Sequence, residues 1–373
     1  DLMKKIFSVL SLFTMLVFQA FAGNTMLKDL TVLTTGGASI SPNFQGNIDQ
    51  YAINLQSDIG NVFVKPLLSD STSTIKIDGK TVNNGDIYNA SVPVGKSTVS
   101  VLVTATDGTA KTYNLNVMRE DIKPIADKFL KFVYTDKETG LTMPYRLFIP
   151  ENYDPKKTYP LVMFMHGGGE RGDDNEKQLL ANQGATIWAK PEEQAKRPCF
   201  VLAPQSHSTW DGGFGVTRGE DNVVNLKNVF TIGKDLKLAH KVLNEVLVNY
   251  NKNIDKNRLY CTGLSQGGFG TWLLNEEYPN LFAAMVPVSG GGNPEKVSVL
   301  VNKPIWAFHA ENDSVIPVSY DRNTISALRN LGANPIYTEY NKETFIFPDG
   351  HFAWVLAYKN EAMREWLFKQ KKN

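Results

Sequence analysis

The chain has 373 residues, of which 42% are hydrophobic and 21% are charged, the balance of an ordinary folded globular protein. Its 39 Lys and Arg residues nearly cancel its 38 Asp and Glu residues, so the net charge is +1. A chain without a large excess of positive charge has no long-range electrostatic attraction to nucleic acid or to an anionic membrane, and we expect neither as a partner.

Residues 1–22 have the pattern of a secretory signal peptide preceded by two extra residues. Met3-Lys4-Lys5 is followed by a short apolar run from Ile6 to Phe18, and Ala20-Phe21-Ala22 supplies a small-residue cleavage pattern. The run is shorter than the roughly 20 residues that a membrane span needs. We therefore expect a mature protein that begins near Gly23 and is secreted or periplasmic.

Residues 25–120 have the pattern of an all-β domain. Short runs with one apolar face are separated by turn signals such as Asp78-Gly79 and Asn84-Gly85. The expected strands are Tyr51–Leu55, Asn61–Val64, Thr74–Asp78, Thr98–Val103 and Thr112–Val117. The pattern predicts two small sheets packed face to face.

This first domain resembles the cadherin-like, immunoglobulin-type β-sandwich modules attached to many exported bacterial proteins, particularly in "TDGTAKTYNLNV". All six tryptophans and all five histidines lie outside it, and its aromatic residues suit core packing. A sugar-binding face usually needs exposed flat aromatic rings. We therefore favour a spacer or partner-contact role, with homo-oligomerisation as one form of it, over carbohydrate binding.

Residues 121–127 are the expected linker, and residues 128–373 change to strands that alternate with helices. The expected strands are 161–165, 199–203, 258–262, 283–288 and 304–309, and the expected helices are 236–250, 269–278, 320–331 and 353–369. Continuous apolar strands separated by helices predict a mostly parallel sheet covered by helices on both faces, an α/β domain. The two cysteines, Cys199 and Cys261, fall in apolar runs, and we expect buried free thiols rather than a disulfide.

The stretch "CTGLSQGGFG" places Ser265 between an expected strand and an expected helix, within the pattern Gly-x-Ser-x-Gly. In that context the pattern predicts a sharp turn that exposes a nucleophilic serine, because glycines at 263 and 267 remove the side chains that would block the turn. The N-terminus of the following helix also brings a positive dipole end near the serine.

A nucleophilic serine needs a base, and His351 is the expected one. Only His309 and His351 follow Ser265, and in such a sheet the order is serine, acid, histidine. His309 ends an apolar strand and has no acid in the required place before it. His351 lies in a glycine-containing loop, "FPDGHFAW", before the last helix.

Asp313 is the expected acid, because it follows the strand 304–309 by several residues and precedes a turn toward the next helix. A carboxylate there would hold His351 in the productive tautomer. Glu311 is the alternative, and Asp349 is too close in sequence to His351 to be favoured.

The expected oxyanion donors are the backbone N–H groups of Gln266 and Gly168. The first belongs to the residue after the nucleophile, and the second to the glycine-rich loop "HGGGERG" after the strand 161–165. Gly167 is the alternative to Gly168, and His166 is interpreted as a structural loop residue. No ligand spacing for a metal is visible, and we expect neither a metal nor a cofactor.

On the basis of these motifs, the segment from about residue 130 to residue 370 resembles the α/β-hydrolase superfamily. Within it the chain is similar to exported esterases and "predicted peptidases" related to feruloyl and acetylxylan esterases and dienelactone hydrolase, and to thermophilic esterases with an immunoglobulin-like domain. The matching segments include "HGGGERGDDN", "YCTGLSQGGFGTW" and "FHAENDSVIPV". The resemblance implies hydrolysis of a carboxylic ester through an acyl-enzyme. A departure at Phe352 and Ala353, where relatives often carry a polar residue, affects the expected rim of the pocket.

We expect the long connections 170–197 and 205–230 to form the substrate pocket. Trp210 and Trp354 are candidate walls, and Glu170 and Arg171 are candidates to pair and brace the oxyanion loop. The substrate class suggested by the resemblance is a small or polysaccharide-linked ester of plant cell walls. Two alternatives stay open: a serine peptidase of the prolyl-oligopeptidase type, and an inactive hydrolase-fold binding protein.

Overall fold

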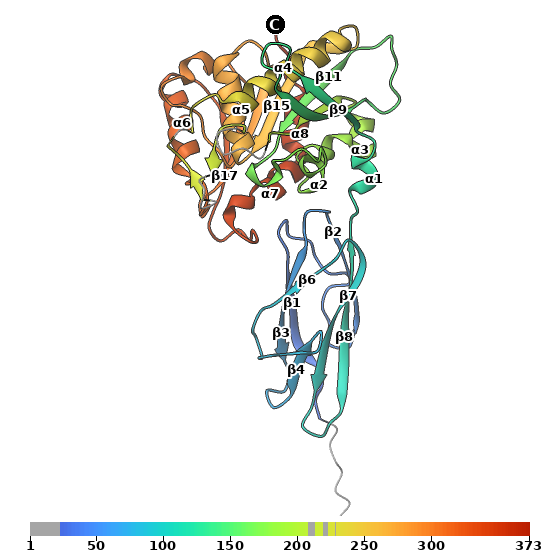
Figure 1. Ribbon diagram of the computed structural model, residues 1–373. Helices are drawn as coiled ribbons and strands as arrows, with labels where there is room; N and C mark the ends of the chain where they lie inside the picture. Colours follow the sequence, from blue (N-terminus) through green and yellow to red (C-terminus); the bar gives the residue numbers. More distant parts are fainter. Residues whose placement is uncertain (1–22, 208–212, 219–222, 228) are drawn as a thin grey trace, which may run out of the picture.

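The computed structural model describes residues 23–207, 213–218, 223–227 and 229–373. They form two domains, a slender β-domain and a larger domain of strands and helices (Figure 1). The expected signal peptide, residues 1–22, and Trp210 lie outside the described residues.

The first domain is a sandwich of a five-stranded and a three-stranded sheet, in the strand orders β2-β8-β7-β4-β5 and β1-β3-β6. Its strands are β1 Leu27–Leu33, β2 Gln50–Leu55, β3 Asn61–Leu68, β4 Thr74–Ile77, β5 Lys80–Val82, β6 Tyr88–Ser91, β7 Gly95–Thr104 and β8 Ala110–Arg119. Alternate residues are buried, as in β2, where Tyr51, Ile53 and Leu55 point inward. This period of two is what packs one face of each sheet into a shared core.

The second domain is built on an eight-stranded sheet in the order β18-β17-β16-β15-β11-β12-β10-β9. Its strands are β9 Leu130–Thr135, β10 Thr142–Phe148, β11 Tyr159–Met165, β12 Phe200–Pro204, β15 Ile254–Leu264, β16 Ala284–Val288, β17 Trp306–Ala310 and β18 Ile336–Tyr340. Neighbours from β18 to β12 pair in parallel, and β10 and β9 pair antiparallel at one edge. A further pair, β13 Thr217–Arg218 and β14 Val224–Asn225, stands outside this sheet.

Helices cover both faces of the large sheet. The α-helices are α1 Lys123–Ala126, α2 Lys177–Leu180, α3 Pro191–Lys196, α4 Lys234–Asn249, α5 Gln266–Glu277, α6 Ser319–Asn330, α7 Trp354–Lys359 and α8 Glu361–Phe368; the 3₁₀ turns are η1 Gly168–Glu170, η2 Thr186–Ala189, η3 Val297–Leu300 and η4 Gly350–Phe352. Of the two largest core clusters, one contains buried residues of α4, α5 and α6, and the other contains those of η2, α7 and α8. The expected two-domain fold class, a sandwich followed by an α/β domain, is confirmed.

The single helix expected over residues 353–369 is wrong. The chain breaks at Asn360, which has an extended backbone and whose side chain accepts the backbone N–H of Met363 at the start of α8. Asn is a strong N-cap, so a new helix starts there. The strands β9, β10 and β18 were not foreseen. The two edge strands, β9 and β18, contain no fully buried residue and so have a weak apolar pattern. The inner strand β10 is almost wholly buried, but Pro144 and Arg146 interrupt its apolar run. Cys199 and Cys261 are both buried and free, as expected.

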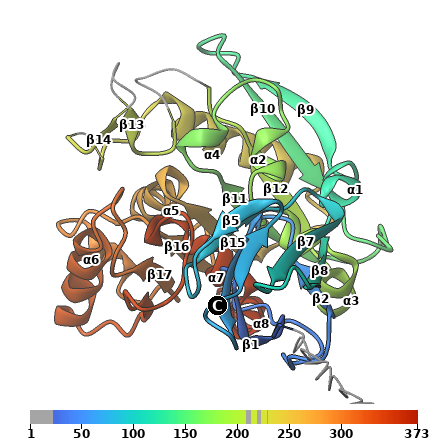
Figure 2. The same cartoon turned by 90° about the horizontal axis from the view of Figure 1, so that it is seen from below.

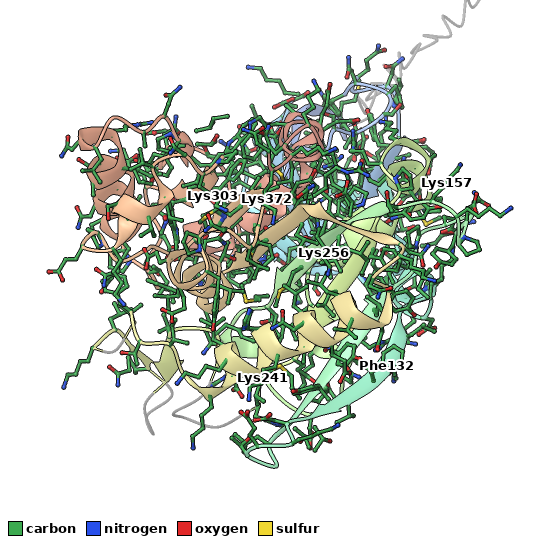
Figure 3. All side chains as sticks on the ribbon, turned by 90° about the horizontal axis from the view of Figure 1, so that it is seen from above. Phe132, Lys157, Lys241, Lys256, Lys303 and Lys372 are labelled. Atoms are coloured by element: carbon green, nitrogen blue, oxygen red, sulfur yellow. The ribbon has the colours of Figure 1, made fainter. Side chains whose placement is uncertain are left out.

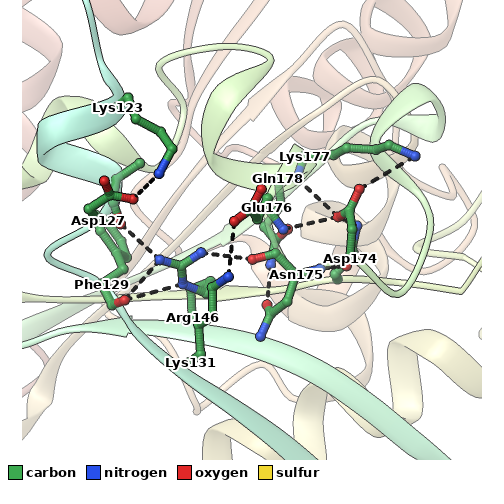
Figure 4. A network of polar contacts seen from close by, with 12 residues as sticks. Lys123, Asp127, Phe129, Lys131, Arg146, Asp174, Asn175, Glu176, Lys177 and Gln178 are labelled. Atoms are coloured by element: carbon green, nitrogen blue, oxygen red, sulfur yellow. Dashed lines mark hydrogen bonds and ion pairs between the residues drawn. The ribbon is translucent and has the colours of Figure 1, made fainter.

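Arg146 of β10 ties the linker to a loop of the second domain (Figure 4). Its guanidinium donates to the carbonyl oxygens of Ala126 and Phe129, each at 2.9 Å, and to that of Asn175 at 2.8 Å. Asn175 in turn donates its N–H to Gln205 Oε1 at 2.7 Å. Because Arg146 is buried, these carbonyls satisfy its donors, and the linker is anchored to the loop that follows β11.

The end of the second domain that points away from the sandwich carries scattered lysines, among them Lys157, Lys256, Lys303 and Lys372 (Figure 3). Lys372 holds the C-terminal tail in place, since its Nζ donates to the carbonyl oxygens of Asn280 and Leu281, each at 3.0 Å. Within the described part of the chain, no helix is both long and apolar enough to cross a bilayer.

Candidate active site

Ser265 occupies the sharp turn between β15 and α5. Its backbone is strained, with φ 53° and ψ −116°, a conformation that a residue other than glycine adopts only when its surroundings enforce it. Gly267 makes the turn possible, because a Cβ on this residue would lie 2.0 Å from the carbonyl oxygen of Met165. The backbone N–H of Ser265 donates to Val288 on the neighbouring strand at 2.9 Å.

The three residues predicted to act together are hydrogen-bonded in series. Ser265 Oγ lies 2.9 Å from His351 Nε2, and His351 Nδ1 lies 2.8 Å from Asp313 Oδ2. The other oxygen of Asp313, Oδ1, accepts the backbone N–H groups of Val315 and Ile316 at 2.9 and 2.8 Å. Because a carboxylate only accepts, His351 carries a proton on Nδ1, and Nε2 is left to accept the proton of the serine.

The two alternative acids lie elsewhere. Glu311 is exposed, and its Oε2 accepts the backbone N–H of Lys342 at 3.0 Å. Asp349 accepts the backbone N–H of His351 at 2.7 Å and the hydroxyl of Ser314 at 2.5 Å. Asp349 therefore shapes the loop that carries His351 and does not contact its ring nitrogens.

A fourth residue, His309, belongs to this cluster and was missed by the sequence reasoning. Its Nε2 lies 3.2 Å from Asp313 Oδ2 and 2.9 Å from the carbonyl oxygen of Ile316. Its Nδ1 lies 2.8 Å from Asp321 Oδ2, and Asp321 Oδ1 accepts the indole N–H of Trp272 at 3.0 Å. The available signal was the spacing of four residues between His309 at the end of a strand and Asp313 in the loop.

The charges of this buried cluster depend on one another. Burial opposes ionisation of Asp313, but the hydrogen bonds from His309 and His351 outweigh it and hold its pKa at about 2. Burial also opposes the cationic form of His309, but the carboxylates of Asp313 and Asp321 raise its pKa to about 10. Asp313 is thus an ionised acceptor for His351 across the neutral pH range.

The loop after β11 is held so that its backbone faces the serine. Ser206 donates its backbone N–H to Nε2 of His166 at 2.9 Å, so Nδ1 carries the proton and donates it to the carbonyl oxygen of Gly167 at 2.6 Å. Burial lowers the pKa of His166 to about 4, which keeps the ring neutral. The N–H of Gly168 belongs to the same trans peptide as that carbonyl and points the opposite way.

The positions of Gly167 and Gln266 fit the predicted oxyanion pocket. A Cβ on Gly167 would lie 3.5 Å from Ser265 Cβ, so the loop runs against the nucleophile. The N–H of Gln266 is at the first position of α5, where a helix has no internal acceptor to offer. The roles of Gly168 and Gln266 as oxyanion donors stay predictions that these positions support.

The remaining predicted residues lie around the same centre. Arg171 Nε donates to the carbonyl oxygen of Gly168 at 2.9 Å, and Glu170 Oε1 lies 3.5 Å from Asn182 Nδ2. Trp354 is almost buried, and its ring packs edge-on against that of His351 with the centroids 5.1 Å apart. Trp354 therefore supports the histidine ring. Among the described residues, no group of three or more His, Cys, Asp and Glu side chains is arranged to hold a metal ion.

Comparisons with known proteins agree with this architecture. Residues 27–120 match the family model described as a cadherin-like β-sandwich domain. The crystal structure of a thermostable esterase is 31% identical to this chain, covers 86% of it and 99% of its own length, and superposes with a TM-score of 0.62. Both the predicted sandwich type and the predicted hydrolase type are thereby confirmed.

Curated relatives match shorter segments. The poly(3-hydroxyalkanoate) depolymerase C of Paucimonas lemoignei is 28% identical over 140 residues, which are 35% of this chain and 28% of that protein. The protein named "Probable feruloyl esterase C" of Aspergillus terreus is 25% identical over 181 residues, which are 47% of this chain and 56% of that protein. The chain therefore spans less than two thirds of the length of these curated relatives.

Proposed function

Since this chain belongs to the family of the thermostable esterase and has its α/β-hydrolase fold, we propose that it is a serine hydrolase of carboxylic esters, with Ser265, His351 and Asp313 as its catalytic residues. The observation that carries the proposal is the unbroken series of hydrogen bonds from Ser265 Oγ through His351 to Asp313. The strained backbone of Ser265 supports it as well, because such strain collects at functional residues.

The reaction proceeds in two halves. His351 Nε2 takes the proton of Ser265 Oγ as the oxygen attacks the ester carbonyl, and Asp313 stabilises the imidazolium that forms. The N–H groups of Gln266 and Gly168 receive the negative charge that develops on the carbonyl oxygen. The bond to the alcohol oxygen then breaks, and His351 returns the proton to that oxygen. An acyl group stays on Ser265 until water attacks its carbonyl carbon while His351 takes a proton from that water. The bond to Ser265 Oγ then breaks, the acid leaves, and His351 returns the proton to Oγ.

We further propose that the substrates are esters of plant cell walls, with feruloyl or acetyl groups on xylan, and that the protein acts outside the cytoplasm. The support for the substrates is the likeness to proteins with such names, including the "Bifunctional acetylxylan esterase/xylanase XynS20E" of Neocallimastix patriciarum, 27% identical over 184 residues. This likeness covers 48% of the present chain. The support for the location is the signal-peptide pattern of residues 1–22. The substrate class therefore rests on likeness, whereas the reaction type rests on geometry.

The test is a panel of p-nitrophenyl acetate, methyl ferulate, acetylated xylan and a peptide amide, assayed with the wild type and Ser265→Ala. Ester hydrolysis that disappears in Ser265→Ala, with no peptide cleavage, supports the proposal. A fluorophosphonate should also add to the wild type, and mass spectrometry should place it on Ser265. Peptide cleavage, or ester hydrolysis that survives in Ser265→Ala, contradicts the proposal.

A further inference from the structure

A cavity of about 290 Å³ lies between the two domains, next to the loop that carries His351. The second domain supplies an aromatic wall with Phe347, Phe352 and Trp354. The sandwich supplies the facing wall, which includes the polar side chains of Asp58 and Asn61. In Figure 1 the chain before α7 reaches toward the end of the sandwich, and in Figure 2, seen from below, the sandwich lies in front of the second domain.

Direct contacts fix the two walls relative to each other. The backbone N–H of Phe347 donates to Thr35 Oγ1 of the sandwich at 2.8 Å, and the ring of Phe63 lies 4.8 Å from that of Phe347. Lys359 Nζ donates to the carbonyl oxygen of Gly36 at 2.8 Å. These contacts join residues distant in sequence, so the cavity is part of the folded chain and not a gap between independent units.

The cavity lies beside two aromatic residues that pack on His351. Both Trp354 and Phe352 pack on His351, with ring centroids 5.1 and 6.3 Å from its own. His351 returns the proton to the departing alcohol, so the alcohol oxygen must lie at its Nε2. Phe352 and Trp354 line the cavity as well, and they are the link between the cavity and the ring of His351.

The two walls have the chemistry that a sugar ring requires. Aromatic faces pack against the apolar face of such a ring, and carboxylate and amide groups bond its hydroxyls. The bonds to Asp58 from Gln56 and Gln183 both reach Oδ1, at 3.1 and 3.3 Å. Asn61 is held in place by Nδ2, which donates to Asn89 Oδ1 at 2.8 Å. Both polar side chains are therefore oriented before any ligand binds.

From these observations we infer that the cavity is a subsite for the sugar that forms the alcohol part of the ester, and that the sandwich contributes its polar contacts. This inference rests on the proposed esterase function. It also explains why the sandwich lacks a face of exposed aromatic residues: the aromatic half of the subsite comes from the other domain.

The experiment compares two acetyl esters that differ in their alcohol, p-nitrophenyl acetate and an acetylated xylo-oligosaccharide. The variants are Asp58→Asn and Asn61→Ala, and the matched control is Asp49→Asn, an exposed carboxylate that directly precedes β2. Removing a bond to a charged acceptor weakens binding about tenfold. KM for the oligosaccharide should therefore rise about tenfold in Asp58→Asn with kcat little changed, and both constants for p-nitrophenyl acetate should stay at wild-type values.

The other outcomes overturn the inference in distinguishable ways. An unchanged KM for the oligosaccharide, or an equal loss on both esters, shows that Asp58 does not meet the sugar. The same variants are also assayed on methyl ferulate, and a loss confined to that ester would assign the cavity to the acyl group instead. If the wild type hydrolyses p-nitrophenyl acetate but not the oligosaccharide, the sugar subsite is rejected and the proposed esterase function stands. If the wild type hydrolyses no ester, the proposed function itself is rejected.

Discussion

His309 Nε2 lies 3.2 Å from Asp313 Oδ2, the same oxygen that accepts the proton of His351 Nδ1 at 2.8 Å. The carboxylate at the centre of the site is thus held from two sides by imidazole rings. Asp321 on α6 completes the arrangement, since its Oδ2 lies 2.8 Å from the other nitrogen of His309. His309 therefore helps to fix the position of Asp313 and affects how strongly Asp313 attracts the proton on His351 Nδ1.

We predict that His309→Leu lowers kcat roughly tenfold or more for every ester. Leucine removes a donor to Asp313 Oδ2 and leaves the buried Asp321 without its cationic partner, so of the two imidazole rings only that of His351 still holds this oxygen of Asp313. The measurement is kcat against pH for the wild type and the variant. A shift of the acidic limb of this profile distinguishes the positioning role from a simple loss of folded protein.

Asp321→Asn is the matched comparison for that variant. The amide oxygen can keep the bond from Trp272, and the amide nitrogen can donate to His309 Nδ1 while His309 Nε2 still faces Asp313. The fall in kcat should therefore be smaller than in His309→Leu. Full activity in His309→Leu, or an equal fall in both variants, contradicts the positioning role.

A second prediction separates the two candidate acids. Asp313→Asn should lower kcat by about 10⁴, the loss seen when the orienting carboxylate of a serine–histidine pair becomes an amide. Glu311→Gln should leave activity at the wild-type level, because Glu311 is exposed and bonds only the backbone N–H of Lys342 among the contacts described. The measurement is the initial rate on p-nitrophenyl acetate. A large loss of activity in Glu311→Gln would show that Glu311, and not Asp313, is the acid.

Features that depend on local pattern were predictable from the sequence. The parallel sheet follows from continuous apolar runs, and the turn at Ser265 follows from glycines at fixed spacing between a strand and a helix. His351 and Asp313 were predicted from their order in the chain. In the structure His351 bonds Ser265, and Asp313 bonds the other side of the His351 ring. Their catalytic role is a proposal that this geometry supports.

Features that depend on contacts between distant segments were not predictable. The apolar pattern of "WAFHA" in β17 gives no sign that His309 is buried between two carboxylates, because Asp321 reaches it from α6. The junction of the domains is likewise invisible in the sequence, since Thr35 and Phe347 meet only after both domains have folded. Such contacts set the surroundings of the site, whereas the motifs specify its chemistry.

The close packing at the turn predicts a large difference between two glycine substitutions. Gly267→Ala would place a Cβ 2.0 Å from the carbonyl oxygen of Met165, so α5 or β11 must move, at a cost of about 3 kcal/mol or more. Gly169→Ala meets no atom within 4 Å and should fold normally. Thermal unfolding of the two purified variants checks this, and an unfolding midpoint for Gly267→Ala equal to that of the wild type would contradict the packing argument.

The junction of the domains predicts that the sandwich supports the loop that carries His351. The ring of Phe63 lies 5.0 Å from Phe345 and 4.8 Å from Phe347, and two residues later Asp349 bonds the backbone of His351. Phe63→Ala should therefore lower kcat several-fold on every ester, because the loop gains freedom.

Phe44→Ala is the control for that variant. Phe44 stacks on Tyr51 inside the sandwich, at 5.9 Å, so its loss weakens the same domain without touching the loop. At a temperature where both variants are folded, kcat of Phe44→Ala should match the wild type. Equal activities of Phe44→Ala and Phe63→Ala would show that the sandwich does not act through the loop.

The buried ring of His166 predicts a loss of stability in mild acid. Burial lowers its pKa from 6.5 to about 4, so between these values the unfolded chain binds a proton that the folded protein refuses. Stability from this group is complete above pH 6.5 and is lost as the pH falls toward 4, by about 2 kcal/mol between pH 7 and pH 5. Urea unfolding at the two pH values measures it. In His166→Asn, whose amide can still donate to Gly167, the difference between the two pH values should shrink by that amount; an unchanged difference would mean that His166 is protonated in the folded protein.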